Sequence, residues 1–247
     1  MTTATVSPAV HANAAPGPSR IGSVLRLHTV AWPLLVAWPV GLLAVSFAIS
    51  WTIYYLIGTD EGAGFTGSIA ALLGFVIAFY VQALTQSFPF ALGLSVTRRE
   101  FYTATLLMAL GQSAIFAVAV QVLSVIESAT DGWGVYMRMF GLARYVTDNP
   151  VLQLLSGFAI LLLTSGIAVV AGAIYQRWRT TGLLAAGTTL FCTVGLAAVV
   201  ITWARWWPEI GSWFVDVPRA VPLVALPLTL AVFALACGWV ALRRATP

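Results

Sequence analysis

The chain contains no lysine, and this absence removes several functions at once. A Walker-type phosphate-binding loop needs a lysine that reaches the nucleotide phosphates, so the chain carries no ordinary ATPase site of its own. Schiff-base chemistry, which depends on a lysine amine, is excluded for the same reason. If ATP drives this protein, a separate subunit must hydrolyse it.

Charge of either sign is scarce. Only 8% of the 247 residues are charged and 60% are hydrophobic, whereas soluble domains carry about 25% charged residues. This composition predicts an integral membrane protein. The net charge of +4 does not indicate nucleic-acid binding, because the arginines come in pairs at the ends of apolar segments.

The apolar segments also lack ionisable side chains, which mark proton relays and ion pathways in membrane proteins. This argues against a proton-coupled carrier or pump. Both histidines, His11 and His28, precede the first apolar segment, so we expect no base or zinc ligand at membrane depth. Cys192 and Cys237 lie within apolar segments, where a cysteine behaves as a small hydrophobic residue. We therefore expect neither a catalytic site nor a metal site.

Apolar segments long enough to cross a membrane, which takes about 20 residues, recur along the chain. Both ends are predicted to be cytoplasmic, because eight arginines fall on that side and four on the other, and short cytoplasmic loops collect positive charge. The predicted fold is an all-α integral membrane protein, with one domain at 19–247 and six transmembrane helices at residues 31–57, 65–87, 102–126, 150–175, 182–203 and 220–242.

The segment before the first span is predicted to have two parts. Residues 1–18 are rich in Ala, Thr, Pro and Ser, which is typical of a disordered tail. Residues 19–30 carry apolar side chains at helical spacing, with Arg20 and Arg26 off that face, which predicts an amphipathic helix in the membrane interface. A plain juxtamembrane basic segment is the alternative.

Tryptophan is concentrated between the fifth and sixth spans, at Trp206, Trp207 and Trp213, with Pro208 among them. Tryptophan prefers the headgroup zone, so these residues could be simple interfacial anchors. The alternative, which we carry as the prediction, is a re-entrant segment that caps a pathway from outside. Such backbone is tolerated where it is buried in protein or lines a cavity.

The polar side chains inside the predicted spans are all uncharged. Gln82, Gln86, Gln112 and Gln121 are candidates for lining a weakly polar route for an amphipathic substrate. The alternative is hydrogen bonding between helices, worth about 0.6 kcal/mol per bond on average.

Residues 88–101 close an uncharged run that is too long for one span. The run begins at Gly62 and reaches Arg98, whereas a span needs only about 20 residues. Pro89 disfavours helix at Phe88, so we expect the span to end or kink there, followed by an apolar loop outside the bilayer. Such a loop is costly in water unless something covers it, which predicts a docking surface for a soluble partner.

Between the second and third predicted spans the chain has the run Leu92-Gly93-Leu94-Ser95-Val96-Thr97-Arg98-Arg99-Glu100-Phe101. Together with the six spans, this run resembles the permease subunits of ABC transporters of the second export type, in particular small bacterial members. The resemblance implies that this run is a coupling helix seated in a groove of a separate ATPase subunit, which binds ATP and Mg²⁺. Two ATPase subunits and two permeases, identical or paralogous, would form the transporter among the lipids of the bacterial cell membrane.

The residues of this loop then divide into two kinds of contact. Arg98, Arg99 and Glu100 would supply charge-assisted contacts to the ATPase. The apolar anchors would be Phe90, Leu92, Leu94 and Phe101.

The implied function is export of an amphipathic substrate, such as an antibiotic, peptide or lipid, by a subunit that is not itself an enzyme and holds no cofactor. The alternative is a non-transporting membrane scaffold or sensor that recruits a cytoplasmic partner through the same loop.

Overall fold

The computed structural model describes residues 37–58 and 64–243, and these are mostly helical. Within this part of the chain, five helices are long and apolar enough to cross a membrane, as expected of a multi-pass membrane protein: Trp38–Ile57, Gly67–Gly93, Arg98–Ala129, Pro150–Trp203 and Val221–Leu242. The predicted tail and the predicted interfacial helix with Arg20 and Arg26 lie outside the described residues.

Three of the helices are apolar around their whole circumference. α2 (Trp38–Ile57), α3 (Ala70–Gln82) and α8 (Leu226–Leu242) contain no charged residue. A helix that is hydrophobic all round is suited to a membrane rather than to the surface of a soluble domain. α2 is largely exposed, so in a membrane lipid would cover much of it.

Small residues let the central helices approach closely, as they do in membrane proteins generally. A Cβ added at Gly172 would lie 2.8 Å from the Cβ of Leu84, and one at Gly238 would lie 2.8 Å from a methyl group of Val169. The core between α3, α5 (Arg98–Ala129), α6 (Pro150–Trp203) and α8 therefore depends on glycine at these contacts. The side chains of Tyr80 and Val169 are fully buried within it.

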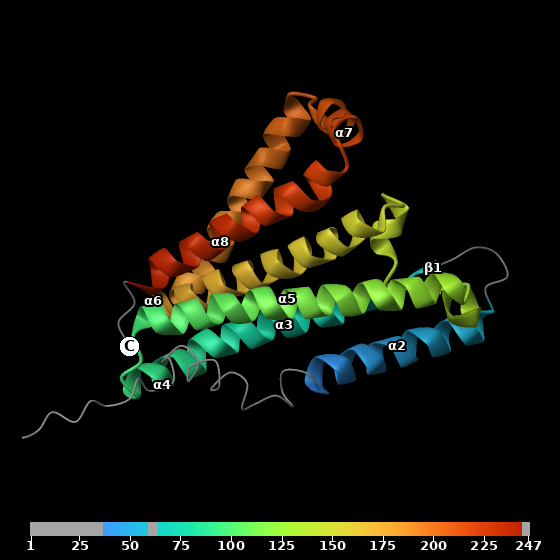
Figure 1. Ribbon diagram of the computed structural model, residues 1–247. Coiled ribbons are helices and arrows are strands. Elements are labelled where there is room, and N and C mark those ends of the chain that lie inside the picture. The colour runs from blue at the N-terminus through green and yellow to red at the C-terminus, as the bar shows by residue number, and fades with distance from the viewer. Residues whose placement is uncertain (1–36, 59–63, 244–247) are drawn as a thin grey trace, which may run out of the picture.

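The predicted fourth and fifth spans fall in one element, α6, of 54 residues. At 1.5 Å per residue this length is about 80 Å, whereas the hydrocarbon core of a bilayer is about 30 Å thick. The backbone leaves the helical region at Arg179 (φ 55°, ψ −151°), inside the predicted loop at 176–181. Figure 1 shows the chain changing direction there, from the yellow arm beside α5 to the orange arm that leads to α7 (Trp207–Asp216).

Of the two predicted outcomes at Phe88, an end of the span or a kink, the first does not occur. The helical run continues through a π-helical turn, Ala83–Ser87, into α4 (Phe88–Gly93), with Pro89 in its first turn. The amide of Phe88 donates to the carbonyl of Ala83, and Pro89 has no amide hydrogen to donate. The carbonyls of Leu84 and Thr85 consequently lose their usual helical donors, and a side chain from α6 replaces them, as described below.

The third helix extends beyond its predicted end and includes Glu127, which is buried. Its carboxylate accepts hydrogen bonds from three consecutive backbone amides, those of Met139, Phe140 and Gly141, at 2.8, 2.9 and 3.0 Å. The indole of Trp133 lies 3.4 Å away as a fourth donor. Glu127 thus fixes the fold of the segment at 130–149.

The same segment contributes a small parallel strand pair, a departure from the all-α prediction. β1 (Gly64–Phe65) pairs with β2 (Met137–Arg138). Each strand has only two residues, so the pair links the beginning of the second span to the 130–149 segment without forming a sheet of its own.

The tryptophan-rich segment after α6 forms the amphipathic helix α7, which contains Trp207, Pro208 and Trp213 and directly follows Trp206. The indole of Trp207 donates to the hydroxyl of Thr202 at 2.9 Å, which ties α7 to the end of α6. No residue of α7 is buried by the described part of the chain. Re-entrance into the membrane stays a prediction.

Candidate partner-docking site

The predicted docking loop is a short helix followed by a tight turn. After α4, the amide of Val96 donates to the carbonyl of Ala91 at 3.2 Å and the amide of Ser95 donates to that of Leu92 at 3.1 Å. This pair of bonds is the Schellman arrangement that ends many helices, and its turning residue is usually glycine. Here Ser95 takes the left-handed conformation, with φ at 62°. Gly93 lies two residues earlier, at the last position of α4.

The chain then enters α5 through a capping box. The hydroxyl of Thr97 accepts from the amide of Glu100 at 3.2 Å, and the Glu100 carboxylate accepts from the amide of Thr97 at 2.9 Å. The two side chains satisfy amides that the first helical turn would otherwise leave unpaired. Glu100, which was expected to contact a partner, therefore holds the start of α5. The spacing Thr-x-x-Glu in the sequence is the signal for this role.

The four predicted apolar anchors do not all face outward. The side chains of Phe90 and Leu94 are 60% and 54% exposed, and they are four residues apart at the end of α4. Leu92 packs against the core, and Phe101 is only 1% exposed, with its ring in an edge contact with Phe88. The prediction that Phe101 and Leu92 are surface anchors is therefore wrong. Both side chains pack inward and hold the loop against the helices.

The two arginines of the loop have different surroundings. The guanidinium of Arg98 donates to the carbonyl of Arg243 at 2.8 Å, at the end of α8. A cation at this position also stabilises the negative end of the α8 dipole. Arg99 is exposed and lines an open groove of about 580 Å³ between α5 and α8.

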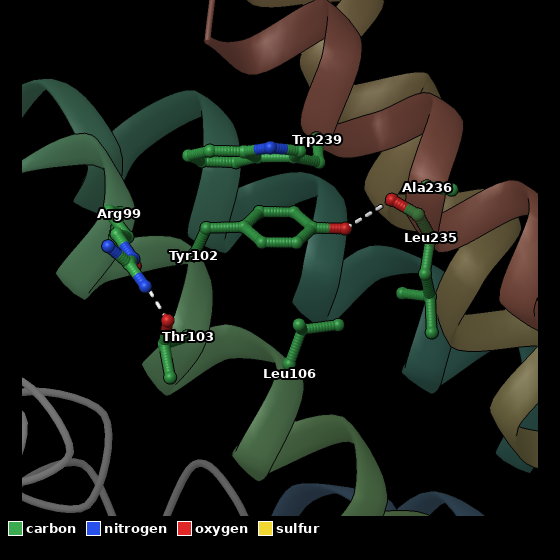
Figure 2. A pocket seen from close by; sticks show the side chains of 7 residues that line it. All are labelled: Arg99, Tyr102, Thr103, Leu106, Leu235, Ala236 and Trp239. Carbon is green, nitrogen blue, oxygen red and sulfur yellow. Dashed lines mark hydrogen bonds between the residues drawn. The ribbon is translucent and has the colours of Figure 1, made fainter.

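Figure 2 shows this groove, with the ring of Trp239 over the ring of Tyr102 and Arg99 at its edge. The hydroxyl of Tyr102 donates to the carbonyl of Leu235, which connects α5 to α8 across the groove. The groove is mostly apolar with one cationic side chain, so it suits an amphipathic surface rather than a small polar molecule.

Gln176 supports the loop from α6, and sequence reasoning missed it. Its side-chain nitrogen donates to the carbonyls of Leu84 and Thr85 at 2.6 and 3.0 Å, the two groups left without donors by the π-helical turn and by Pro89. Gln176 is buried. A glutamine facing a proline-containing neighbouring helix was the available signal, but only the tertiary structure pairs the two segments.

The four glutamines proposed to line a pathway do not lie along one route. Gln82 and Gln86 bond to each other at 3.2 Å on an exposed face. Gln112 is buried and accepts from the hydroxyl of Tyr80 at 2.8 Å, while its amide nitrogen is left without a partner. Gln121 donates to Gln153 at 3.1 Å. Most of these contacts join neighbouring helices, which was the alternative explanation.

No group of three or more His, Cys, Asp or Glu side chains that could hold a metal ion occurs among residues 37–58 and 64–243. No protein-family model, curated protein or solved structure matches the chain.

Proposed function

We propose that the chain is the membrane-spanning permease subunit of an ATP-driven exporter of the ABC-2-like class, which moves an amphipathic substrate such as an antibiotic, peptide or lipid. One observation supports this most directly. Phe90 and Leu94 form an exposed apolar pair on a helix end that the rest of the molecule holds firmly. An apolar pair that the described part of the chain leaves uncovered is expected where a partner docks.

In this proposal α6 crosses the membrane twice, which gives six spans with both ends cytoplasmic. The distribution of charge supports the orientation. Figure 1 shows α4, the start of α5, the bend of α6 and the end of α8 at one end of the molecule. Five described arginines belong to that end: Arg98, Arg99, Arg177, Arg179 and Arg243. Positive charge of this kind marks the cytoplasmic side.

The partner supplies the chemistry that this chain lacks. Its two copies would bind ATP and Mg²⁺. Their closure would displace the end of α4 that carries Phe90 and Leu94, here called the α4 tip, in each of two permease copies. The turn before α4 is joined to α6 through Gln176, and the start of α5 after it is joined to α8 through the bond from Arg98 to Arg243. Displacement of the tip would therefore shift several spans together and reshape the substrate route.

Co-purification tests the docking surface. The chain is co-expressed with the ATPase subunit encoded beside it, as wild type, as Leu94→Asp and as Val215→Asp. Val215 is a matched control, because it is 66% exposed on α7, which Figure 1 shows far from α4. We expect Leu94→Asp to lower ATPase recovery at least tenfold, which corresponds to about 1.4 kcal/mol, and Val215→Asp to leave it unchanged. Equal recovery with all three proteins at equal membrane insertion would refute the proposal.

A further test separates transport from recruitment alone. If the ATPase docks and amphipathic compounds raise its hydrolysis rate, export is supported. If it docks and no compound changes hydrolysis or crosses the membrane, the scaffold or sensor function is favoured instead.

A further inference from the structure

A cavity of about 500 Å³ lies between α3, α5, the first arm of α6 and the 130–149 segment. Its lining is mostly apolar and includes Leu72, Ala117, Val120, Ile160 and Leu161. The apolar part of this space offers water no hydrogen-bond partners. While it is empty, its lining side chains lack the dispersion contacts that a filled core provides. The cavity therefore favours an apolar occupant.

The polar groups of the cavity belong to the part of each helix nearest the 130–149 segment. Gln121 and Gln153 line it, and the side-chain nitrogen of Gln121 donates to the side-chain oxygen of Gln153 at 3.1 Å. The side-chain nitrogen of Gln153 in turn donates to the carbonyl of Thr147 at 2.8 Å. Each of these amide nitrogens carries two hydrogens, so hydrogen-bond donors remain for a ligand oxygen.

A cation adjoins the same polar end. The side chain of Arg144 donates to the hydroxyl of Ser124 at 3.1 Å, and Ser124 lines the cavity. Arg144 makes no direct ion pair within the described part of the chain, although the buried Glu127 carboxylate lies close by, at Gly141. Its guanidinium has four N–H donors besides the one on Nε, and these can reach a ligand. Basic side chains next to pockets between membrane helices recognise lipid phosphate groups.

The dimensions of the cavity agree with one leaflet. From Ser124 to Ala117 along α5 is about 10 Å, and from Gln153 to Leu161 along α6 is about 12 Å, at 1.5 Å per residue. The hydrocarbon part of one leaflet is about 15 Å thick, half of the bilayer core. The space thus runs from a polar, cationic end near the membrane surface toward an apolar end at greater depth.

We propose that this cavity binds one acyl chain of a membrane phospholipid, taken from the leaflet nearest the 130–149 segment. The chain lies against Leu72 and Leu161, the ester oxygens meet Gln121 and Gln153, and the phosphate meets Arg144. The proposal requires only that the helices cross a membrane, so it stands or falls separately from ATPase docking.

Photolabelling of the full chain in liposomes tests the site directly. The probe is a phosphatidylglycerol with a diazirine near the end of one acyl chain, and the labelled peptides are mapped by mass spectrometry. We expect labelling concentrated on peptides that contain Leu72 and Leu161. Labelling spread evenly over the lipid-facing arm at 182–203, with no excess at the cavity, would overturn the proposal.

A cavity-filling variant provides the second arm. A Cβ at Gly157 would lie 3.9 Å from that of Ala117, so Gly157→Phe places a ring in the cavity. We expect it to lower cavity labelling at least fivefold. Gly187→Phe is the control, because nothing lies within 4 Å of its Cβ position, and its labelling should match wild type. If Gly157→Phe does not fold, Ala117→Val is used, with an expected twofold loss, and undiminished labelling in the folded variant contradicts the proposal.

The headgroup contact has its own readout. Arg144→Gln should lower labelling by the phosphatidylglycerol probe about threefold. The same substitution should leave labelling unchanged with a monoacylglycerol probe, which has the chain and ester but no phosphate. Equal loss with both probes would show that Arg144 only supports the fold, and it would remove the phosphate from the proposal.

Discussion

Replacement of Gln176 by leucine tests how the α4 tip is attached to the rest of the molecule. The substitution keeps a side chain of similar size but removes both donated hydrogen bonds to the carbonyls of Leu84 and Thr85. Neither carbonyl can recover a helical donor, because the Phe88 amide is directed to Ala83 and Pro89 has no amide hydrogen. The two acceptors are left unpaired at a helix contact.

The expected cost follows from the environment. An unpaired buried acceptor costs about 1–3 kcal/mol in proteins generally, but hydrogen bonds between membrane helices average only about 0.6 kcal/mol, with a maximum near 1.7. For two carbonyls we therefore expect Gln176→Leu to lower the free energy of unfolding by about 2 kcal/mol. Gln86→Leu, which alters an exposed glutamine of the same region, should cost less than about 0.5 kcal/mol.

Reversible unfolding of the purified protein in mixed detergent micelles measures these differences. The decisive sample is the double variant with Pro89→Ala, which restores a backbone amide hydrogen that can reach the Thr85 carbonyl. Pro89→Ala should recover about 1 kcal/mol in the Gln176→Leu background and have little effect alone, a coupling typical of residues that share a partner. If the effects of the two substitutions are simply additive, or if Gln176→Leu costs no more than Gln86→Leu, the reasoning is refuted.

Three further predictions concern single groups. Ser95→Gly should raise the free energy of unfolding by about 1 kcal/mol, because Ser95 holds a left-handed conformation that glycine adopts without strain; an unchanged or lower value would contradict this. Glu127→Gln should speed hydrogen exchange at the amides of residues 139–141 at least tenfold, with exchange in α7 of the same sample as the reference. The reason is that a neutral acceptor replaces a charged one. Unaltered protection of these amides would exclude Glu127 as their anchor. Tyr80→Phe should lower the free energy of unfolding more than Gln112→Leu does, because only Tyr80→Phe leaves the whole buried Gln112 side-chain amide unpaired. The reverse order in unfolding measurements would contradict this prediction.

The apolar spans were the most predictable part of the fold, for a physical reason. A membrane requires about 20 apolar residues in a row whatever their partners are, so composition alone locates the helices. The predicted second span and the helical run at Gly67–Gly93 agree at the start and differ at the end. The end was placed too early because Pro89 was expected to end or kink the span at Phe88, whereas a π-helical turn and Gln176 let the helical run continue past it.

Side-chain direction was the least predictable part of the site. The pattern of apolar residues in the loop could not separate Phe90 and Leu94, which are exposed, from Phe101, which packs on Phe88. That difference depends on how α4 and α5 fold back on each other, which no local pattern contains. The third span was likewise predicted to end at residue 126, just before Glu127, because the partners of Glu127 are backbone amides 12–14 residues away that no local pattern identifies.

The hydrogen bonds around α4 limit how its tip can move. Gln176 joins the π-helical turn before α4 to α6, and Arg98 joins the start of α5 to the end of α8. Thr97 and Glu100 fix the connection between α4 and α5. A force applied at Leu94 therefore cannot be absorbed by local unwinding unless several of these bonds break. If a partner drives this protein through Leu94, the spans must move as connected bodies, and the bend at Arg179, where the backbone is not helical, is the place where α6 can change angle.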